Sequence, residues 1–305
     1  MLMTLIDTWL AMRRASGFAL TNYERQLHRF AEFASDCGEG HVRAETAIAW
    51  ASQAATPGQR CRHFQRLVQL ARYLHAEDPR HEVLPQGRFP GKRHRPVPHI
   101  YTAEEARRLL EAAARLGPAG SIRPHTMSTL LALLFATGLR ISEALALRMA
   151  DVTPDGLVIH KTKFGKTRLV PLHSSAHSGL EQYLLRRRRI VGGDDYVFVS
   201  LDSTHLSYAG FRKAWLVVRR EAGLQLPRAG GRGPRVHDIR HTFAVRALEH
   251  APDRRDQVAR HMLAVSTYLG HSCVADTYWY LQTTPTLMSQ VADACQRHFE
   301  RGQQP

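Results

Sequence analysis

The sequence has few cysteines and no long apolar run. None of its four cysteines, at positions 37, 61, 273 and 295, forms a Cys-x-x-Cys pair, so neither a disulfide framework nor a cysteine zinc site is suggested. The longest uncharged apolar stretch, Thr126 to Leu139, is shorter than the ~20 residues of a membrane span. Near the N-terminus Asp7 interrupts the apolar run and arginines follow it, the reverse of a secretory signal. We therefore expect a cytoplasmic or nucleoid protein with no membrane contact.

Acidic residues are also scarce relative to basic ones. The chain has 42 Lys+Arg against 27 Asp+Glu, a net charge of +15. The surplus occurs in both parts, with 14 basic against 9 acidic residues in 1–98 and 28 against 18 in 99–305. Such a charge favours a nucleic acid partner because each neutralised phosphate releases counterions. A compositional bias toward arginine is the alternative explanation. The 44% hydrophobic content excludes wholesale disorder, and 305 residues suffice for about two domains.

Residues 1–84 are predicted to form a helical domain. Thr21 and Glu24 have the spacing of a capping box and predict a helix start. A second helix is expected over 45–53 and a third from Pro57, which is favourable in a first turn.

Prolines and basic residues dominate 85–98. Four prolines in these 14 residues prevent regular pairing, so we expect a semi-extended basic linker. Its basic residues Lys92, Arg93 and Arg95 are predicted to contact DNA.

Residues 99–305 are predicted to be mainly helical, with one small antiparallel sheet. Thr102 and Glu105 form a second capping box at the start. Strands are expected over 156–161 and 167–170, joined by a turn that contains glycine, with a third over 196–199. Helices are expected over 102–116, 125–137, 140–149, 174–190, 207–222, 238–250 and 254–268, with a final one at about 286–299.

Four short motifs in the sequence could carry chemistry, and two of them contain basic residues. Arg140 follows Gly138 in A-T-G-L-R-I-S-E-A-L, which places it near a helix N-terminus, where an anion is favoured. Lys161, Lys163 and Lys166 are three of only five lysines. Because an ammonium releases its proton more readily than a guanidinium, this turn suits a general acid. The simpler explanation of each motif is that its basic side chains are merely exposed to solvent.

The other two signals contain histidine and tyrosine. His237 and Arg240, in H-D-I-R-H, lie three apart and share a helix face, while His237 and His241 alone would be a weak metal pair. Leu-Gly-His271 is followed nine residues later by Tyr280, with Tyr278 between them. Aromatic core packing is the simpler explanation of the two tyrosines.

The order and spacing of these motifs resemble the tyrosine recombinase, or phage integrase, family over about 99–284. The resemblance implies a two-domain, C-shaped DNA clamp in which a helical core-binding domain precedes the catalytic domain. It implies Arg140, Arg240 and His271 as phosphate-binding residues, with Tyr280 as the nucleophile and Tyr278 as its competitor. The remaining assignments are Lys163 as general acid, His237 as general base, Glu143 as an acidic residue of the same helix as Arg140, and Lys161 and Lys166 as DNA contacts.

The implied reaction is strand exchange without a metal, a cofactor or ATP. Tyrosine attack gives a 3′-phosphotyrosine and a free 5′-hydroxyl, and a partner strand reseals the bond through a Holliday junction. The implied partner is double-stranded DNA with inverted-repeat core sites, bound by four protomers, either identical or including related recombinases. The final helix is expected to dock on a neighbouring protomer or to pack on its own domain.

Three other functions compete with this one. A type IB topoisomerase shares the chemistry but relaxes supercoils without site choice. A DNA-binding accessory protein would bind without cutting. A metal nuclease using His237 and His241 would lose activity in EDTA.

Overall fold

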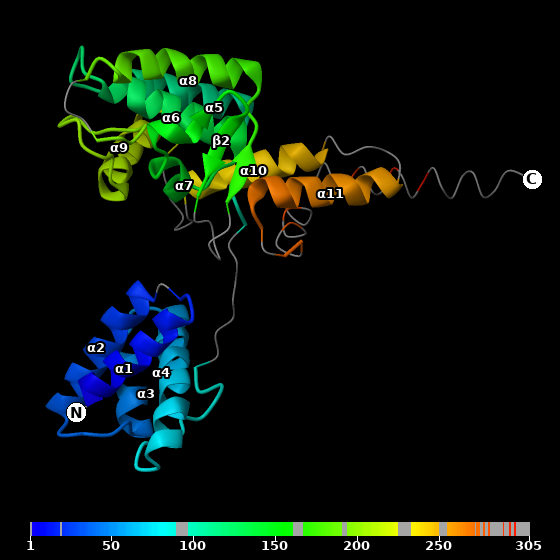
Figure 1. Ribbon diagram of the computed structural model, residues 1–305. Helices are drawn as coiled ribbons and strands as arrows, with labels where there is room; N and C mark the ends of the chain where they lie inside the picture. The colour runs from blue at the N-terminus through cyan, green and yellow to red at the C-terminus, as the bar shows by residue number, and fades with distance from the viewer. Residues whose placement is uncertain are drawn as a thin grey trace, which may run out of the picture. The chain divides into compact units, whose positions relative to one another are not determined.

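The computed structural model divides the chain into two compact units, residues 1–96 and 97–305 (Figure 1). The described residues are 2–18, 20–89, 97–160, 167–190, 194–224, 233–249, 255–271, Cys273, Val274, Thr277, Tyr280, Ser289, Asp293 and Gln296.

The first unit contains four helices, α1 (Leu2–Ala15), α2 (Thr21–Asp36), α3 (Ala44–Ser52) and α4 (Pro57–Glu77). Apolar residues at helical spacing face inward and form a separate core, which includes Ile6, Leu10, Leu27, Phe30 and Leu67. Burial of these side chains supplies the main stabilisation of such a small unit.

The capping box predicted at Thr21 is wrong. Helix α2 begins at Thr21, and its N-cap is Leu20, which has a left-handed backbone (φ 44°) and makes no capping hydrogen bond with its side chain. Thr21 therefore lies inside the first turn, one position too late to cap it. The box that forms in this unit belongs to α4, where Thr56 Oγ1 accepts from the Gln59 N–H at 3.2 Å and Gln59 Oε1 accepts from the Thr56 N–H.

The second unit is built around helix α6 (Arg123–Thr137), which packs against α5 (Ala103–Ala114), α8 (Ser174–Arg187) and α10 (Val236–Glu249). The capping box at Thr102 and Glu105 is confirmed, since each side chain accepts from the other's backbone N–H. The remaining helical elements are α7 (Ile141–Leu145), the 3₁₀ turn η1 (Met149–Asp151), α9 (Tyr208–Glu221) and α11 (Arg255–Leu269).

A three-stranded antiparallel sheet lies in the second unit, in the order β1 (Val152–Thr153), β2 (Gly156–Ile159) and β3 (Arg168–Val170). Leu157 pairs with Val170 and Ile159 with Arg168. A mainly helical fold with a small antiparallel sheet is thus confirmed.

Several predicted elements differ from the observed ones. Residues 196–199 do not form a strand. Tyr196 and Val199 make isolated bridges to Arg148 and His205, because no strand of the described residues runs beside them. The helix expected over 140–149 is short, since it ends at Leu145 and the chain turns into η1. The final helix expected over 286–299 falls mostly outside the described residues; Ser289, Asp293 and Gln296 are helical.

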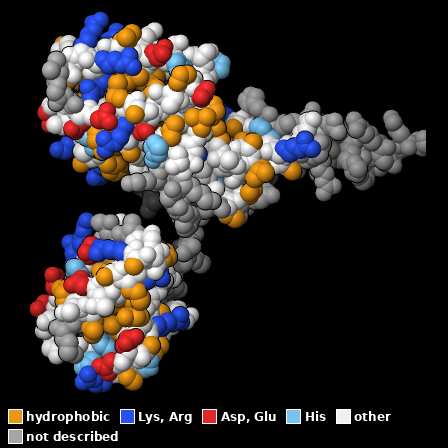
Figure 2. All heavy atoms as spheres, viewed as in Figure 1, with side chains coloured by type: hydrophobic (Ala, Val, Ile, Leu, Met, Phe, Trp, Pro, Cys, Tyr) orange, Lys and Arg blue, Asp and Glu red, His pale blue; other side chains and the backbone are white. Residues whose placement is uncertain are grey.

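None of the helices in the described part of the chain has the length and apolar character of a membrane span. The visible face of each unit carries basic side chains scattered among acidic and apolar ones (Figure 2).

Candidate active site

Arg140 lies at the junction between α6 and α7. Gly138 ends α6 with a left-handed backbone (φ 61°), and a Cβ at this position would lie 2.6 Å from Cδ1 of Phe243. Only glycine therefore suits both the conformation and the space. This turn makes Arg140 the N-cap residue of α7, with 29% of its side chain exposed.

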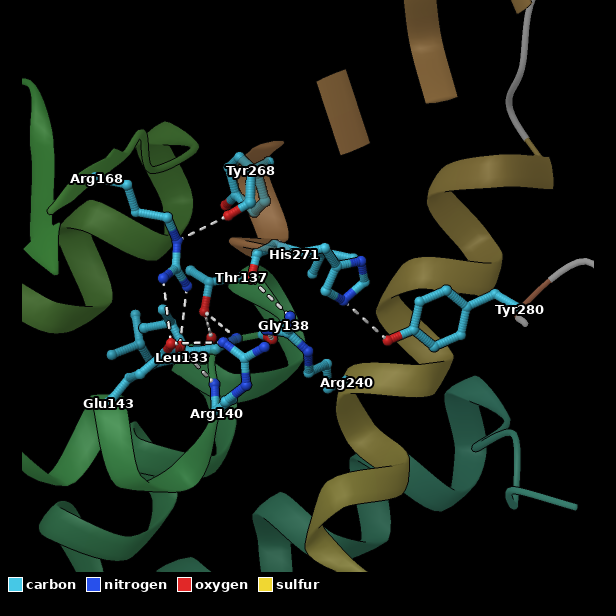
Figure 3. A network of polar contacts seen from close by, with 12 residues as sticks. Leu133, Thr137, Gly138, Arg140, Glu143, Arg168, Arg240, Tyr268, His271 and Tyr280 are labelled. Carbon is cyan, nitrogen blue, oxygen red and sulfur yellow. Dashed lines mark hydrogen bonds and ion pairs between the residues drawn. The ribbon is translucent and has the colours of Figure 1, made fainter. Parts of the chain in front are cut away.

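Glu143 is bound by two arginines. Its carboxylate accepts from the Arg140 backbone N–H at 3.0 Å and from Arg140 NH1 at 2.8 Å. Arg168 NH1 and NH2, from β3, donate to its two oxygens at 3.1 and 2.9 Å. Burial alone would raise the pKa of the Glu143 carboxyl, but the bonds and charge of Arg168 and the bonds from Arg140 lower it to about 2. Glu143 is therefore ionised at neutral pH. Figure 3 shows its ion pairs with Arg140 and Arg168.

Arg240 is a buried cation on α10, only 2% exposed. Its NH1 donates to the Gly138 carbonyl at 2.9 Å and its NH2 to the Leu269 carbonyl at 2.6 Å. Burial and the nearby Arg140 charge lower the pKa of Arg240 to about 10, although Tyr280 acts in the opposite direction. Two guanidinium groups and the tyrosine therefore share one small region (Figure 3).

His271 follows the C-terminal end of α11 and faces Tyr280. The Tyr280 hydroxyl lies 3.5 Å from His271 Nε2, and the two rings stack with centroids 5.8 Å apart. His271 Nδ1 forms a 2.8 Å hydrogen bond with Oγ1 of the buried Thr277. Tyr280 itself is only 4% exposed. The imidazole is therefore fixed on one side by Thr277 and presents its other nitrogen to the phenol. Figure 3 shows the His271 ring facing the Tyr280 hydroxyl.

His237 and His241 occupy adjacent turns of α10. Their ring centroids lie 4.9 Å apart, and the His241 ring also contacts that of Tyr280 at 5.2 Å. Burial, followed by the His237 charge, lowers the pKa of His241 to about 4. The pKa of His237 is also lowered, by partial burial and by Arg240. Both rings are therefore neutral near pH 7.

Arg140, His237, Arg240, His271 and Tyr280 are all described and belong to this one region. Other residues singled out in the sequence lie outside the described residues, namely Lys92, Arg93, Arg95, Lys161, Lys163, Lys166 and Tyr278.

One group of side chains in the described part of the chain has the composition of a metal site: His41, Asp78 and His81, in the first unit. The Val42 N–H donates to His81 Nδ1 at 3.0 Å, so the neutral ring carries its proton on Nε2. A ring in this tautomer has no free electron pair for a metal at Nε2. This group is therefore poorly suited to hold a metal ion.

The sequence patterns assign no role to Arg168 and Thr277, and they assign His241 only to a weak metal pair. Arg168 lies in the R-L-V-P-L motif, but only the fold brings it to Glu143. Thr277 lies three residues before Tyr280, one helical turn away, and this spacing was an available signal. His241 was weighed only as a metal ligand, whereas it packs on Tyr280.

The region combines guanidinium cations, imidazoles and a phenol. Two guanidinium groups can neutralise and orient a phosphate by charge-assisted hydrogen bonds. An imidazole whose nitrogen faces the phenol, as that of His271 does, can move a proton to or from it. The arrangement is therefore suited to nucleophilic attack by tyrosine on a phosphodiester.

Comparison with known proteins identifies the family. The family model described as "Phage integrase family" matches residues 100–286. The chain is 36% identical to y4rB of Sinorhizobium fredii, which is named as an integrase/recombinase, over 97% of each chain. It is 29% identical to tyrosine recombinase XerD of Brucella abortus over 90% of each.

A solved structure shares the fold at low identity. It contains the XerH site-specific recombinase in a post-cleavage complex with a palindromic difH substrate. The TM-score is 0.65 at 20% identity, covering 88% of this chain and 78% of XerH. The chain belongs to the phage integrase family and is a tyrosine recombinase, an enzyme that breaks and rejoins DNA strands in site-specific recombination.

Proposed function

We propose that Tyr280 is the nucleophile of this recombinase and that Arg140, Arg240 and His271 hold the phosphate it attacks. The observation that carries the proposal is the 3.5 Å approach of the Tyr280 hydroxyl to His271, beside the buried Arg240. These residues come from segments as much as 140 positions apart, so local packing alone does not account for their meeting.

The proposed first step forms the bond between the Tyr280 oxygen and phosphorus and breaks the bond from phosphorus to the 5′-oxygen. The phenol proton passes to His271 Nε2, and the resulting imidazolium donates to a non-bridging oxygen. Arg140 and Arg240 stabilise the charge that develops on the phosphate. Lys163 donates a proton to the departing 5′-oxygen. The products are a 3′-phosphotyrosine and a 5′-hydroxyl, and the reverse steps reseal the strand.

His237, the general base expected from the sequence, is the competing candidate for the phenol proton. The contact between Tyr280 and His271 favours His271. Single-turnover cleavage by His271→Ala and His237→Ala over a pH series distinguishes the two, because only loss of the base removes the acidic limb of the rate profile.

The proposed DNA partner is a duplex with inverted-repeat core sites. Exchange between two duplexes needs four cuts, which is the reason to propose four protomers joined through a Holliday junction, of this chain alone or with related recombinases. The net charge of +15 supports the DNA contacts proposed for Lys92, Arg93, Arg95, Lys161 and Lys166. We further propose that residues 1–84 bind the core site, that 85–98 link the units, and that the two units clamp the duplex.

The decisive variant is Tyr280→Phe. The substrate is a nicked duplex selected by footprinting from the DNA that flanks the gene. Wild-type protein should form a covalent adduct that survives denaturing electrophoresis. Tyr280→Phe should form none, because it lacks the attacking oxygen, and should keep its affinity for the duplex within about twofold.

Tyr278→Phe is the matched control and should still form the adduct. The nucleophile assignment is wrong if Tyr278→Phe abolishes the adduct and Tyr280→Phe keeps it. EDTA should leave the wild-type yield unchanged, whereas a metal nuclease would lose its activity.

A further inference from the structure

We infer that Arg168 is a positioning residue, which keeps the Arg140 charge available to the phosphate and fixes the segment that presents His271. This inference rests on the proposed function, because it concerns how the proposed catalytic residues are held. Arg168 is the first residue of β3, directly after the segment that contains Lys163.

The guanidinium of Arg168 is buried, and each of its three nitrogens donates a hydrogen bond to an acceptor. Only 11% of its side chain is exposed. NH1 and NH2 bind the two Glu143 oxygens, and Nε donates to the Tyr268 carbonyl at 3.0 Å. A lysine ammonium cannot reproduce a planar fork that meets a carboxylate and a carbonyl at once.

The ion pair between Arg168 and Glu143 matters because it changes the charge balance around Arg140. The Glu143 side chain is 8% exposed and interacts with two arginines. One carboxylate neutralises one guanidinium, so the Arg168 pair leaves a net positive charge on Arg140 for the phosphate. Without Arg168, Glu143 would neutralise Arg140 in a site where water screens little. The first effect of Arg168 is therefore electrostatic.

The second effect is on the end of α11. Arg168 binds the Tyr268 carbonyl, and Arg240 binds that of the next residue, Leu269. Gly270 follows with φ 68°, and a Cβ there would lie 2.7 Å from Arg168 NH1. Cations are favoured at a helix C-terminus, where the last carbonyls lack partners within the helix. Two arginines therefore fix the backbone immediately before His271.

The test compares three variants in single-turnover adduct formation on the nicked duplex selected with wild-type protein. Arg168→Met should slow cleavage about 100-fold, with DNA affinity within about twofold, as for loss of an electrostatic contribution to the transition state. The cleavage rate of Arg168→Lys should lie between those of Arg168→Met and the wild-type protein. Adding Glu143→Gln to Arg168→Met should raise the cleavage rate about tenfold above that of Arg168→Met alone, because it removes the negative charge that competes with the phosphate for Arg140.

Arg187→Met is the matched control for burial. Arg187 is 5% exposed and binds the carbonyls of Asp194 and Tyr196, neither of which belongs to the candidate active site. It should lower the melting temperature about as much as Arg168→Met while leaving the cleavage rate within about threefold of wild type, as expected for independent sites.

Three results would overturn the inference: Arg168→Met cleaving at the wild-type rate, Arg187→Met losing as much cleavage as Arg168→Met, or no recovery in the double variant. If Arg168→Met does not fold, the same recovery is measured on Arg168→Lys. If the wild-type protein itself forms no adduct, the proposed function is contradicted instead. Failure of the inference about Arg168 and failure of the proposed function are therefore distinguishable.

Discussion

At the scale of single residues, the proposed chemistry depends on hydrogen bonds that fix otherwise mobile side chains. Thr277 is fully buried, and its hydroxyl meets His271 Nδ1 at 2.8 Å. When the imidazole donates this bond, Nε2 carries the electron pair that faces Tyr280. A single hydroxyl therefore helps to decide which nitrogen of His271 accepts the phenol proton.

Thr277→Val tests this role with almost no change in side-chain volume. We expect single-turnover cleavage to slow about 10- to 100-fold, because an imidazole without its orienting partner loses alignment and basicity. The rate is measured from pH 5.5 to 9, and its acidic limb should move.

Thr277→Ser keeps the hydroxyl and should stay within about threefold of wild type. Equal rates for the valine and serine variants would show that the hydroxyl has no part in the reaction.

At the scale of secondary-structure elements, sequence patterns located the helices better than the segments that join them. The Thr102 box and the proline of α4 were found because capping chemistry is local. The box at Thr21 failed because the chain enters α2 through a left-handed Leu20, a backbone choice without a clear sequence signal. The strand predicted over 196–199 was wrong because a short run of apolar and aromatic residues does not by itself supply a neighbouring strand.

The same distinction between local and long-range contacts holds at the site. Gly138 and Arg140 were located from one motif because their geometry is set within one turn. The bond from Arg168 to the Tyr268 carbonyl joins residues 100 positions apart. Such a contact depends on the packing of β3 and α11, which periodicity does not reveal.

The junction between α6 and α7 gives a prediction for stability. Gly138→Ala should lower the free energy of unfolding by about 1–3 kcal/mol, since alanine is strained at positive φ. It should also reduce cleavage, because its Cβ would displace Phe243 and the turn that carries Arg140. Chemical denaturation and adduct formation measure the two effects.

Gly179→Ala is the control, in the middle of α8 with no atom within 4 Å of the added Cβ. It should raise stability by about 0.5–1 kcal/mol, since alanine favours the helix. An equal change in the free energy of unfolding of both variants would refute the strain attributed to alanine at position 138.

At the scale of the whole molecule, pH changes the stability of the protein through histidines that are neutral in the folded state. The pKa of His241 falls from its ordinary 6.5 to about 4 because of burial and then because of His237. The unfolded chain therefore binds a proton between pH 6.5 and 4 that the folded chain excludes, so stability is lost as pH falls through this range.

We expect the free energy of unfolding to decrease on the order of 3 kcal/mol through this histidine as pH falls from about 6.5 to about 4. Denaturant titrations followed by circular dichroism at several pH values measure it. His241→Phe keeps a ring beside Tyr280 but cannot bind the proton, so its slope against pH should be flatter. Parallel curves for the two proteins would contradict this account.

One polypeptide supplies the phenol, its imidazole neighbour and both guanidinium groups of this region. In the assembly proposed above, each copy would therefore bring its own set of these groups. A mixed assembly would gain or lose cutting capacity one subunit at a time, without complementation between copies that carry different defects.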